Sequence, residues 1–519
     1  MNKYVLLLSV TFACLSTQAQ RWQETFENAP RNLYYHSHNP TRIGHNLIRQ
    51  HTVAQLAYQQ QRGDFHSPSL GEQSQFSAYI GGLHHIGKFD LQGYMGYQNM
   101  TERAQRWNST LWINPYNPFV LADSVAGDAR TEAFELHTTA TYTINTHWRL
   151  GAEAGLRTGN RSDQNDPRPR AVTAIIPIIL GVEHVANKYL TLGIAGEVRL
   201  LNSVVEYYNV HGENNHTYFL MKGMGDYVRR SSGDEPGYKR DYTGHSYAAS
   251  LQVGYKPRCW QNMAEVRVWT ASEEATDGGT TYRFRGGDYR EIGLSVQERM
   301  QWHARAETQH TLEFEANYTT ANGIWYDQRR EVDIARGGAT IYHILNKSTL
   351  QRQKRLMASL SYRRDVYRNN QRAYFVGSEV GIKQIRYEQL LGTSSPTQHI
   401  QHLHLGLRGG KAFKYRGIIL WGELGGSYYR PLKRVYAHGS TYSNNHDIGS
   451  TYTLPHYAHA ASGRIIGYGV IDTHFALNQD LKLGVYLRAQ SEQASSIPET
   501  IANKAQSYTT AHIGVYLHF

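Results

Sequence analysis

Hydrophobic and polar residues alternate with a period of two in many separate segments of this 519-residue chain. In residues 89–98, one face carries Phe89, Leu91, Met95 and Tyr97, and the other carries polar residues, tyrosine and glycine. Residues 148–157 and 481–490 repeat this pattern. Alternation over about ten residues predicts a β-strand with one apolar face.

The same reading along the whole chain predicts eighteen strands. They lie near residues 52–61, 75–86, 88–100, 131–144, 147–158, 171–185, 189–201, 245–256, 262–271, 288–302, 310–320, 352–364, 371–387, 399–410, 417–429, 463–477, 481–490 and 506–519. The alternation is weakest in 52–61, 262–271 and 288–302, so sixteen strands is the competing count.

The connections between these strands alternate strictly between short and long. Short turns such as 87–88, 145–146 and 478–480 follow every second strand, and long connections such as 101–130, 202–244, 321–351 and 430–462 lie between them. A soluble β-sandwich has no reason to place all its long loops at one end. The pattern predicts an antiparallel transmembrane β-barrel of 16–18 strands, with short periplasmic turns, long extracellular loops and both termini in the periplasm.

Composition agrees with a barrel. After the first twenty residues no stretch reaches the 18 or so apolar residues that a spanning helix needs, and residues 171–185, which come nearest, are interrupted by Pro177 and Glu183. Tyrosine (38) and glycine (47) are abundant. In a membrane barrel only every second residue of a strand faces lipid, and a barrel of 16–18 strands leaves room for water inside.

The N-terminus reads as a signal peptide. Lys3 precedes a short apolar stretch, and Thr17 and Ala19 are small residues at the positions that a signal peptidase recognises, so we expect residues 1–19 to be removed. Lipoprotein processing at Cys14 is the alternative. Residues 20–51 are irregular and form a plug in the lumen or lie along the periplasmic rim, and residues 52–519 form the barrel. If Cys14 leaves, Cys259 has no partner for an intramolecular disulfide.

The C-terminus carries a second barrel feature. The chain ends at Phe519, with Leu517 on the same face. We interpret Leu517 and Phe519 as an assembly signal for the outer-membrane barrel assembly machinery; the alternative is an ordinary edge strand. The expected surroundings are outer-membrane lipid.

Three short motifs resemble those of one family. The signal ends in Thr17-Gln18-Ala19-Gln20, the second long loop holds Trp112-Ile113-Asn114-Pro115 and Asn117-Pro118-Phe119, and a third motif is Asp166-Pro167-Arg168-Pro169. Together they resemble an uncharacterised outer-membrane barrel family of Bacteroidota, known only as a domain of unknown function. The resemblance implies a barrel over nearly the whole mature chain and implies no activity.

Strand parity places charged residues on the predicted lumen wall. They are Arg149, Glu153, Arg157, Glu379, Lys383, Arg408, Glu423, Lys482 and Arg488. This set holds six cations and three carboxylates, and the chain carries a formal charge of +11 without a compact basic run, which argues against nucleic-acid binding. We therefore expect a channel, or the membrane component of a solute-uptake system, for polar or anionic solutes. The alternative is a non-conducting scaffold that docks a surface lipoprotein or a TonB-dependent partner.

Other candidate sites are weaker. His402 and His404 share one face of a strand and could bind a metal if a third ligand joined them; otherwise they are part of a polar wall. The loop aromatics Trp107, Trp112, Tyr116 and Phe119 indicate a folded-in constriction, a docking surface or ordinary loop packing. No catalytic motif or cofactor-binding motif stands out, so we expect no enzyme activity and no cofactor.

Overall fold

The computed structural model describes residues 31–48, 50–65, 67, 71–165, 167–208, 216–231, 238–257, 259–279, 282–305, 307–333, 339–369, 371–390, 396–416, 418–437, 448–478, 481–498 and 507–519. The predicted signal peptide, with Cys14 and the cleavage position, lies outside these residues. Cys259 is an exposed free thiol.

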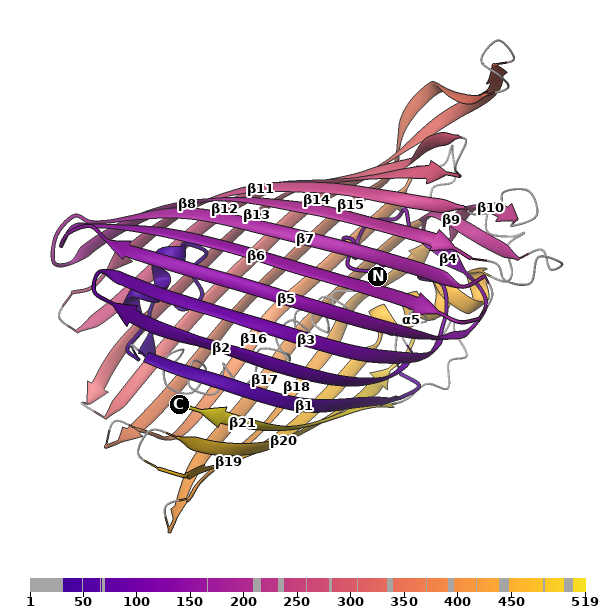
Figure 1. Ribbon diagram of the computed structural model, residues 1–519. Helices are drawn as coiled ribbons and strands as arrows, with labels where there is room; N and C mark the ends of the chain where they lie inside the picture. Colours follow the sequence, from indigo (N-terminus) through magenta and orange to yellow (C-terminus); the bar gives the residue numbers. More distant parts are fainter. Residues whose placement is uncertain are drawn as a thin grey trace.

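Eighteen antiparallel strands form one closed barrel (Figure 1). They are β1 (Gln50–Gly63), β2 (Glu72–Ile86), β3 (Phe89–Gln105), β5 (Gly127–Thr143), β6 (Trp148–Asp163), β7 (Pro169–Val185), β8 (Leu190–Tyr207), β11 (Lys239–Tyr255), β12 (Trp260–Gly278), β13 (Arg283–Arg305), β14 (Thr308–Asp333), β15 (Ala339–Arg368), β16 (Gln371–Gln389), β17 (Thr397–Tyr415), β18 (Ile418–Ala437), β19 (Gly463–Ala476), β20 (Lys482–Ser496) and β21 (Ser507–His518). Each pairs with the next along the chain, and β1 pairs with both β2 and β21. The predicted barrel is confirmed, with eighteen strands and not sixteen.

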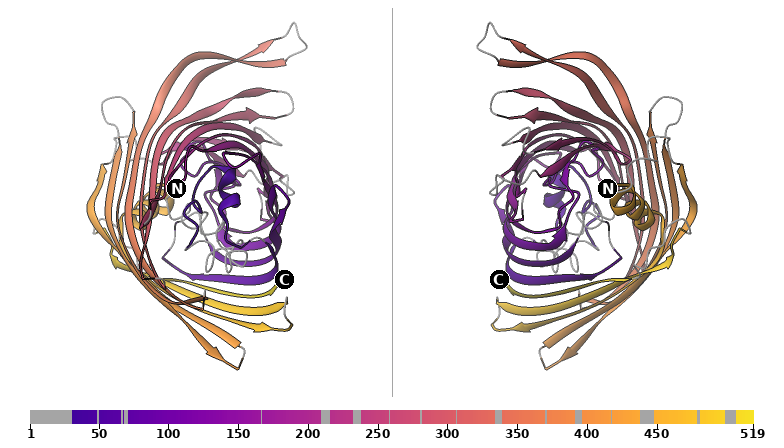
Figure 2. Two further views of the ribbon diagram at one scale, coloured as in Figure 1. Left: turned by 90° about the vertical axis from the view of Figure 1, so that its left-hand side faces the viewer. Right: turned by 90° about the vertical axis from the view of Figure 1, so that its right-hand side faces the viewer.

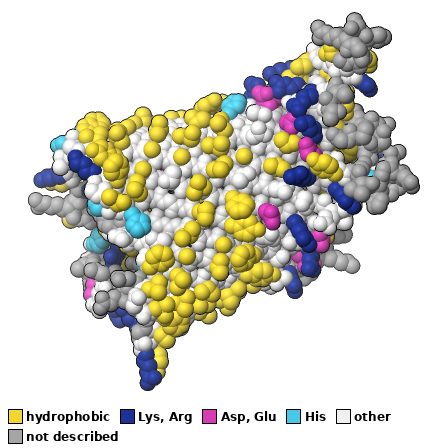
Figure 3. All heavy atoms as spheres, viewed as in Figure 1, with side chains coloured by type: hydrophobic (Ala, Val, Ile, Leu, Met, Phe, Trp, Pro, Cys, Tyr) yellow, Lys and Arg dark blue, Asp and Glu magenta, His cyan; other side chains and the backbone are white. Residues whose placement is uncertain are grey.

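Strand parity separates the two faces of the wall as the alternation predicted. Leu91, Leu136, Leu180 and Leu251 are exposed on the outside, where Figure 3 shows apolar side chains across the middle of the wall and charged ones toward its ends. The neighbouring positions point inward and are largely buried. An apolar belt of this kind faces lipid in membrane barrels.

All the short connections lie at one end of the barrel. Three of them use the same device: the side-chain oxygens of Asn145, Asn187 and Asn478 accept hydrogen bonds from backbone N–H groups two or three residues further on. An asparagine that caps its own turn closes a hairpin in few residues. The strict short-turn pattern therefore has a local chemical cause.

The long connections contain more regular structure than the loops that the sequence predicted. Residues 321–351 are mostly strand, because β14 and β15 continue past the other strands and pair as a projecting hairpin (Figures 1 and 2). Residues 101–130 and 202–244 supply β4 (Leu121–Asp123), β9 (Thr217–Gly223) and β10 (Asp226–Ser231), which form a separate three-stranded sheet. Residues 430–462 contain η5 (Gly449–Thr453) and α5 (Leu454–Ala461). The predicted strands ended at the length that crosses a membrane, whereas in the structure backbone pairing between neighbouring strands continues beyond that length.

The last residue closes the barrel. The Phe519 N–H donates to the Thr52 carbonyl at 2.9 Å, and the Thr52 N–H donates to the Phe519 carbonyl at 2.7 Å. The side chains of Leu517 and Phe519 are exposed on the outer face. Their role as an assembly signal stays a prediction. Among the described residues, no helix combines the length and apolar character needed to cross a membrane.

Candidate functional site: two inserts in the barrel

Residues 31–48 lie inside the barrel, near the end with the short turns (Figure 2). The segment contains η2 (Pro40–His45), and it contacts opposite parts of the wall. The Thr141 hydroxyl on β5 donates to the Pro40 carbonyl, and the Arg31 guanidinium lies over the ring of Tyr367 on β15, 4.0 Å from its centre. The segment therefore crosses the lumen. We call residues 31–48 the N-terminal insert.

Asn39 anchors the N-terminal insert to the wall. Its Oδ1 accepts a hydrogen bond from the Thr41 N–H at 3.1 Å, and this bond caps η2. Its Nδ2 donates to the carbonyls of Val182 on β7 and Ile194 on β8, at 3.1 and 3.4 Å. The Asn39 side chain is fully buried. The Asn39 amide thus caps its own turn through Oδ1 and binds the barrel wall through Nδ2.

Ion pairs hold the rest of the N-terminal insert. Arg42 Nη2 donates to Glu153 Oε2 at 2.7 Å. His45 Nε2 lies 2.7 Å from Glu183 Oε2, and Arg149 Nη1 lies 2.7 Å from the other oxygen of the same carboxylate. Arg149 and Glu153 are thus on the inner wall as predicted, but each is engaged in an ion pair.

A second set of polar contacts lies across the lumen, where Glu265 on β12 receives the N-terminal insert. The Ser37 hydroxyl donates to Glu265 at 2.6 Å, His38 Nδ1 lies 2.6 Å from it, and the His38 N–H donates to it as well. Glu183 and Glu265 are almost completely buried. A buried carboxylate needs such partners, and Glu265 receives them from the insert, whereas Glu183 is also paired with Arg149 on the wall.

Glycines make room for the N-terminal insert in the wall. A Cβ atom added at Gly181 would lie 2.1 Å from Asn39 Oδ1, and one added at Gly151 would lie 2.6 Å from the Thr41 nitrogen. Gly151 and Gly181 are direct cross-strand partners on β6 and β7. The inserted backbone approaches the sheet more closely than any side chain would allow.

The other end of the lumen is crossed by the loop between β3 and β4. The loop repeats the asparagine device twice: Asn114 Oδ1 accepts from the Tyr116 N–H and Asn117 Oδ1 accepts from the Phe119 N–H, both at 3.0 Å. The Asn117 amide and the Asn114 N–H donate to opposite oxygens of Glu273, each at 2.8 Å. Every one of these asparagines precedes a proline, as Asn39 does. We call residues 106–123 the loop insert.

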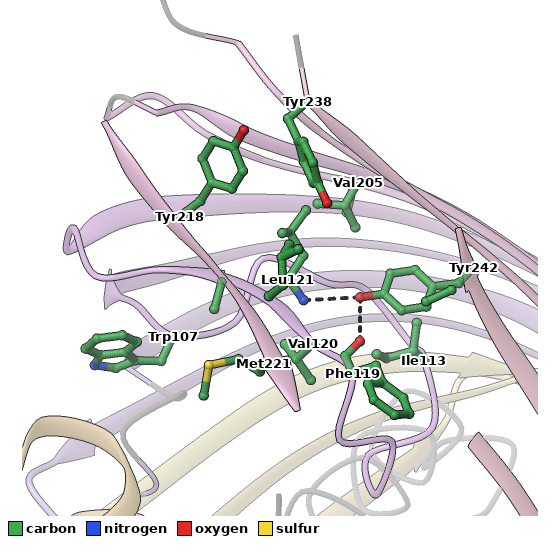
Figure 4. Close-up of a cluster of buried hydrophobic side chains, with 14 of the residues drawn as sticks. Trp107, Ile113, Phe119, Val120, Leu121, Val205, Tyr218, Met221, Tyr238 and Tyr242 are labelled. Carbon is green, nitrogen blue, oxygen red and sulfur yellow. Dashed lines mark hydrogen bonds between the residues drawn. The ribbon is translucent and has the colours of Figure 1, made fainter. Parts of the chain in front are cut away.

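A hydrophobic core covers the loop insert. It joins residues of the loop to β4, β9 and the inner wall, and Figure 4 shows its members converging from these elements. The Tyr242 hydroxyl accepts from the Leu121 N–H at 3.1 Å and donates to the Phe119 carbonyl at 2.9 Å. Ile448, just before η5, belongs to the same core, so three long connections close this end together.

The four loop aromatics singled out from the sequence all point into this assembly. Trp107 and Phe119 belong to the hydrophobic core. Trp112 lies under the guanidinium of Arg157, 3.9 Å from its ring centre, and Tyr116 lies under Arg355 at 3.6 Å. The four rings therefore pack against loops and the inner wall, with Arg157 contributing from the wall, and their role as a constriction stays a prediction.

The opposite wall keeps charged side chains in contact with water. On β16 to β18, Arg408 is exposed on the inner face and Glu379 is partly exposed. Lys383 is buried, Glu423 accepts a hydrogen bond from the Tyr468 hydroxyl at 2.9 Å, Lys482 is half-buried and Arg488 lies over the Tyr468 ring. All nine residues predicted from strand parity thus lie on the inner wall.

The inner wall carries further charges of both signs that were not counted from the sequence. Glu291, Glu313 and Asp365 are paired with Arg355, Arg299 and Arg363 on the same wall. The positive balance of the lumen therefore stays a prediction.

His402 and His404 have different partners. His402 is buried with Nε2 3.1 Å from the Ser462 carbonyl, and His404 stacks on Tyr429 with Nδ1 3.5 Å from Glu379. Within the described ranges, no group of three histidine, cysteine or acidic side chains is placed to bind a metal ion. The geometry shows these two rings as parts of a polar wall.

Two short inserts close the barrel from its two ends, and its wall carries an outer apolar belt. This is the geometry of a bacterial outer-membrane barrel. A family model described as a family of unknown function (DUF6850) matches residues 40–519, and the chain belongs to that family.

Solved structures with a similar fold are distant. The copper transporter OprC is 8% identical, with a TM-score of 0.41, over 91% of this chain and 81% of that one. The RagAB peptide importer is 7% identical with a TM-score of 0.41, over 91% and 87%. A Pseudomonas aeruginosa FadL homologue is 9% identical with a TM-score of 0.33, over 95% and 94%. No curated protein matches the chain. At these values the likenesses carry no argument about function.

Proposed function

We propose that this protein is the barrel component of an outer-membrane solute-uptake system, closed at rest and opened by release of the N-terminal insert. The observation that carries the proposal is the contrast between the two inserts. The loop insert is covered by a large hydrophobic core, whereas the N-terminal insert packs only Leu33 and Tyr34 against Met263 in a small cluster and is otherwise held by hydrogen bonds and ion pairs. Polar contacts exchange for water with a small net free-energy change, so the N-terminal insert is the part that can leave.

The inner wall supports passage of polar solutes. Arg408 and Glu379 are accessible to water beside the inserts, and both signs of charge are represented around them. Release of the N-terminal insert would add Glu183 and Glu265 to the accessible surface. We therefore expect an aqueous path for polar solutes, and the mild anion preference inferred from the sequence stays a prediction.

A liposome-swelling assay with neutral sugars of increasing size tests this function. The variant is Asn39→Ala with Arg42→Gln, which removes one anchor and one ion pair of the insert. Leu47→Ala, an exposed position of the same segment, is the matched control. The expected result is slow swelling for the wild type and the control, and fast swelling for the double variant. Equal rates for all three would contradict a releasable insert.

A docking scaffold is the second candidate, supported by the projecting hairpin of β14 and β15. Val332, Ile344 and Leu345 are exposed there, beyond the part of the wall that other strands cover. Exposed apolar residues on a projecting element suit a protein partner such as a surface lipoprotein or a TonB-dependent transporter. A pull-down with residues 328–344 replaced by a short turn tests it: loss of a specific outer-membrane partner supports docking, and unchanged capture contradicts it.

A further inference from the structure

Basic side chains cluster on the outer face of the barrel, just beyond the apolar belt. Lys354 on β15 is the direct cross-strand partner of Arg386 on β16, and Arg386 is the direct partner of His399 on β17. All three positions have the outward parity of Leu360, Val380 and Leu405, which are exposed on the same strands. Three neighbouring strands thus place two cations and an imidazole side by side at the end with the long loops.

Further cations flank this row. Arg352 lies two residues from Lys354 on the same face, and Arg430 and Lys433 are exposed on β18. Glu388 is the acidic residue among them; it pairs with Arg386 at 2.5 Å and lies directly opposite Arg352. Glu388 thus neighbours Arg352 and Arg386, whereas Lys433 and Arg430 lie two strands away, opposite Gln401 and Leu403 on β17. We call Arg352, Lys354, Arg386, His399, Arg430 and Lys433 the outer basic patch.

This arrangement costs free energy unless an anion is bound. Directly opposed residues on neighbouring strands have Cβ atoms about 4.5–5.5 Å apart, and like charges there repel each other. By contrast, Arg170 on β7 of the same rim lies directly opposite an acidic residue, Glu206 on β8.

We propose that the outer basic patch binds the phosphate groups of an anionic lipid in the outer leaflet, and that the lipid carries at least two phosphates. The apolar belt continues directly below the patch, through Leu356, Leu403 and Tyr428, so acyl chains and headgroup fit one continuous surface. Successive strands are about 4.8 Å apart, so the row of three residues spans about 10 Å of the wall. One phosphate does not reach along such a row, whereas a headgroup with two phosphates does.

Native mass spectrometry of the detergent-solubilised barrel tests the proposal. The probes are a diphosphorylated glycolipid, the same glycolipid without phosphates, phosphatidylcholine, and inorganic phosphate as a competitor. The variants are Lys354→Gln with Arg386→Gln, and Arg352→Gln with Lys433→Gln. Arg130→Gln with Arg170→Gln is the control, since it removes two exposed cations from other strands of the same rim, β5 and β7.

The expected result is one tightly retained diphosphorylated lipid on the wild type and on the control. Each patch variant should lose affinity for it by about tenfold or more, as expected for loss of charge-assisted hydrogen bonds. Equal retention by the patch variants, equal loss in the control, or equal binding of the lipids without extra phosphates would overturn the proposal. Complete displacement of the lipid by millimolar phosphate would assign the patch to a soluble anion and would also overturn it. Heat-modified migration on gels confirms that each variant is folded.

Discussion

Substitution of Gly181 by alanine should release the N-terminal insert. The new Cβ would lie 2.1 Å from Asn39 Oδ1 and 2.9 Å from Pro40 Cδ. Asn39 cannot move aside without breaking the bond that caps η2, because its Oδ1 accepts from the Thr41 N–H. The insert must therefore shift away from the wall as a unit.

The size of the effect follows from the contacts that this shift breaks. They are the two hydrogen bonds of Asn39 Nδ2 to β7 and β8, and the bond from Thr141 to the Pro40 carbonyl. Each contributes about 0.5–1.5 kcal/mol, so the docked state should lose about 1.5–4.5 kcal/mol. At about 1.4 kcal/mol for each factor of ten, the released fraction should rise about 10- to 1,500-fold.

Cysteine labelling measures this equilibrium. Ile43 is 2% exposed and makes no side-chain hydrogen bond, so Ile43→Cys is a reporter that reacts only when the insert is released. The exposed Cys259 is replaced by serine in every variant. Gly196→Ala on β8 is the matched control, because a Cβ atom there meets nothing within 4 Å. Labelling should accelerate by about the same factor as the released fraction in Gly181→Ala alone; equal rates in both variants would refute the reasoning.

Three further predictions concern the wall, the last strand and the loop insert. Leu483→Arg places a charge on the lipid face and should cost about 2–4 kcal/mol of folding free energy in denaturant titrations. Gln490→Arg on the inner face is the control, because a side chain at the neighbouring Gly484 would clash with Tyr516. Equal costs for the two variants would mean that the strand faces are assigned wrongly. Deletion of Phe519 should slow assembly of folded barrel in cells, and Phe519→Ala, which keeps both backbone bonds to Thr52, should slow it as well if the side chain is the signal; normal assembly of the alanine variant would leave barrel closure as its role. Burial raises the pKa of Asp123 in the loop insert to about 7, so the docked loop is favoured below pH 4 and loses stability as the pH rises through 7. Hydrogen exchange of residues 105–125, corrected for the intrinsic rate, should accelerate between pH 5 and 8, and Asp123→Asn should abolish that change. The same pH dependence in both proteins would contradict the assignment.

The barrel itself could be predicted because its determinants are local. Alternation as in Phe89 to Tyr97, and turns such as the one capped by Asn145, depend on residues next to each other in the chain. Closing the sheet adds only the pairing of the last strand with β1, which an even strand count already implies.

The inserts could not be predicted in the same way, because their contacts join distant residues. Ser37 meets Glu265, and Asn117 meets Glu273, over more than 150 positions of the sequence. Sequence signals did exist: each insert carries an Asn-Pro pair, and inward-facing glycines such as Gly151 and Gly181 mark places where another backbone approaches the wall. These signals locate a contact but do not say which segment makes it.

Planar-bilayer recording of four proteins tests the central claim most directly: the wild type, a deletion of residues 20–48, a chain with residues 107–120 replaced by a short glycine-serine linker, and the combination of both changes. If the two inserts close an aqueous lumen, the wild type should be silent for most of the time and the combined variant should show stable, large ohmic currents, with the single variants between them. Silence of the combined variant, with a folded barrel shown by heat-modified migration, would contradict a transport lumen. Wild-type currents as large as those of the combined variant would contradict closure by the inserts.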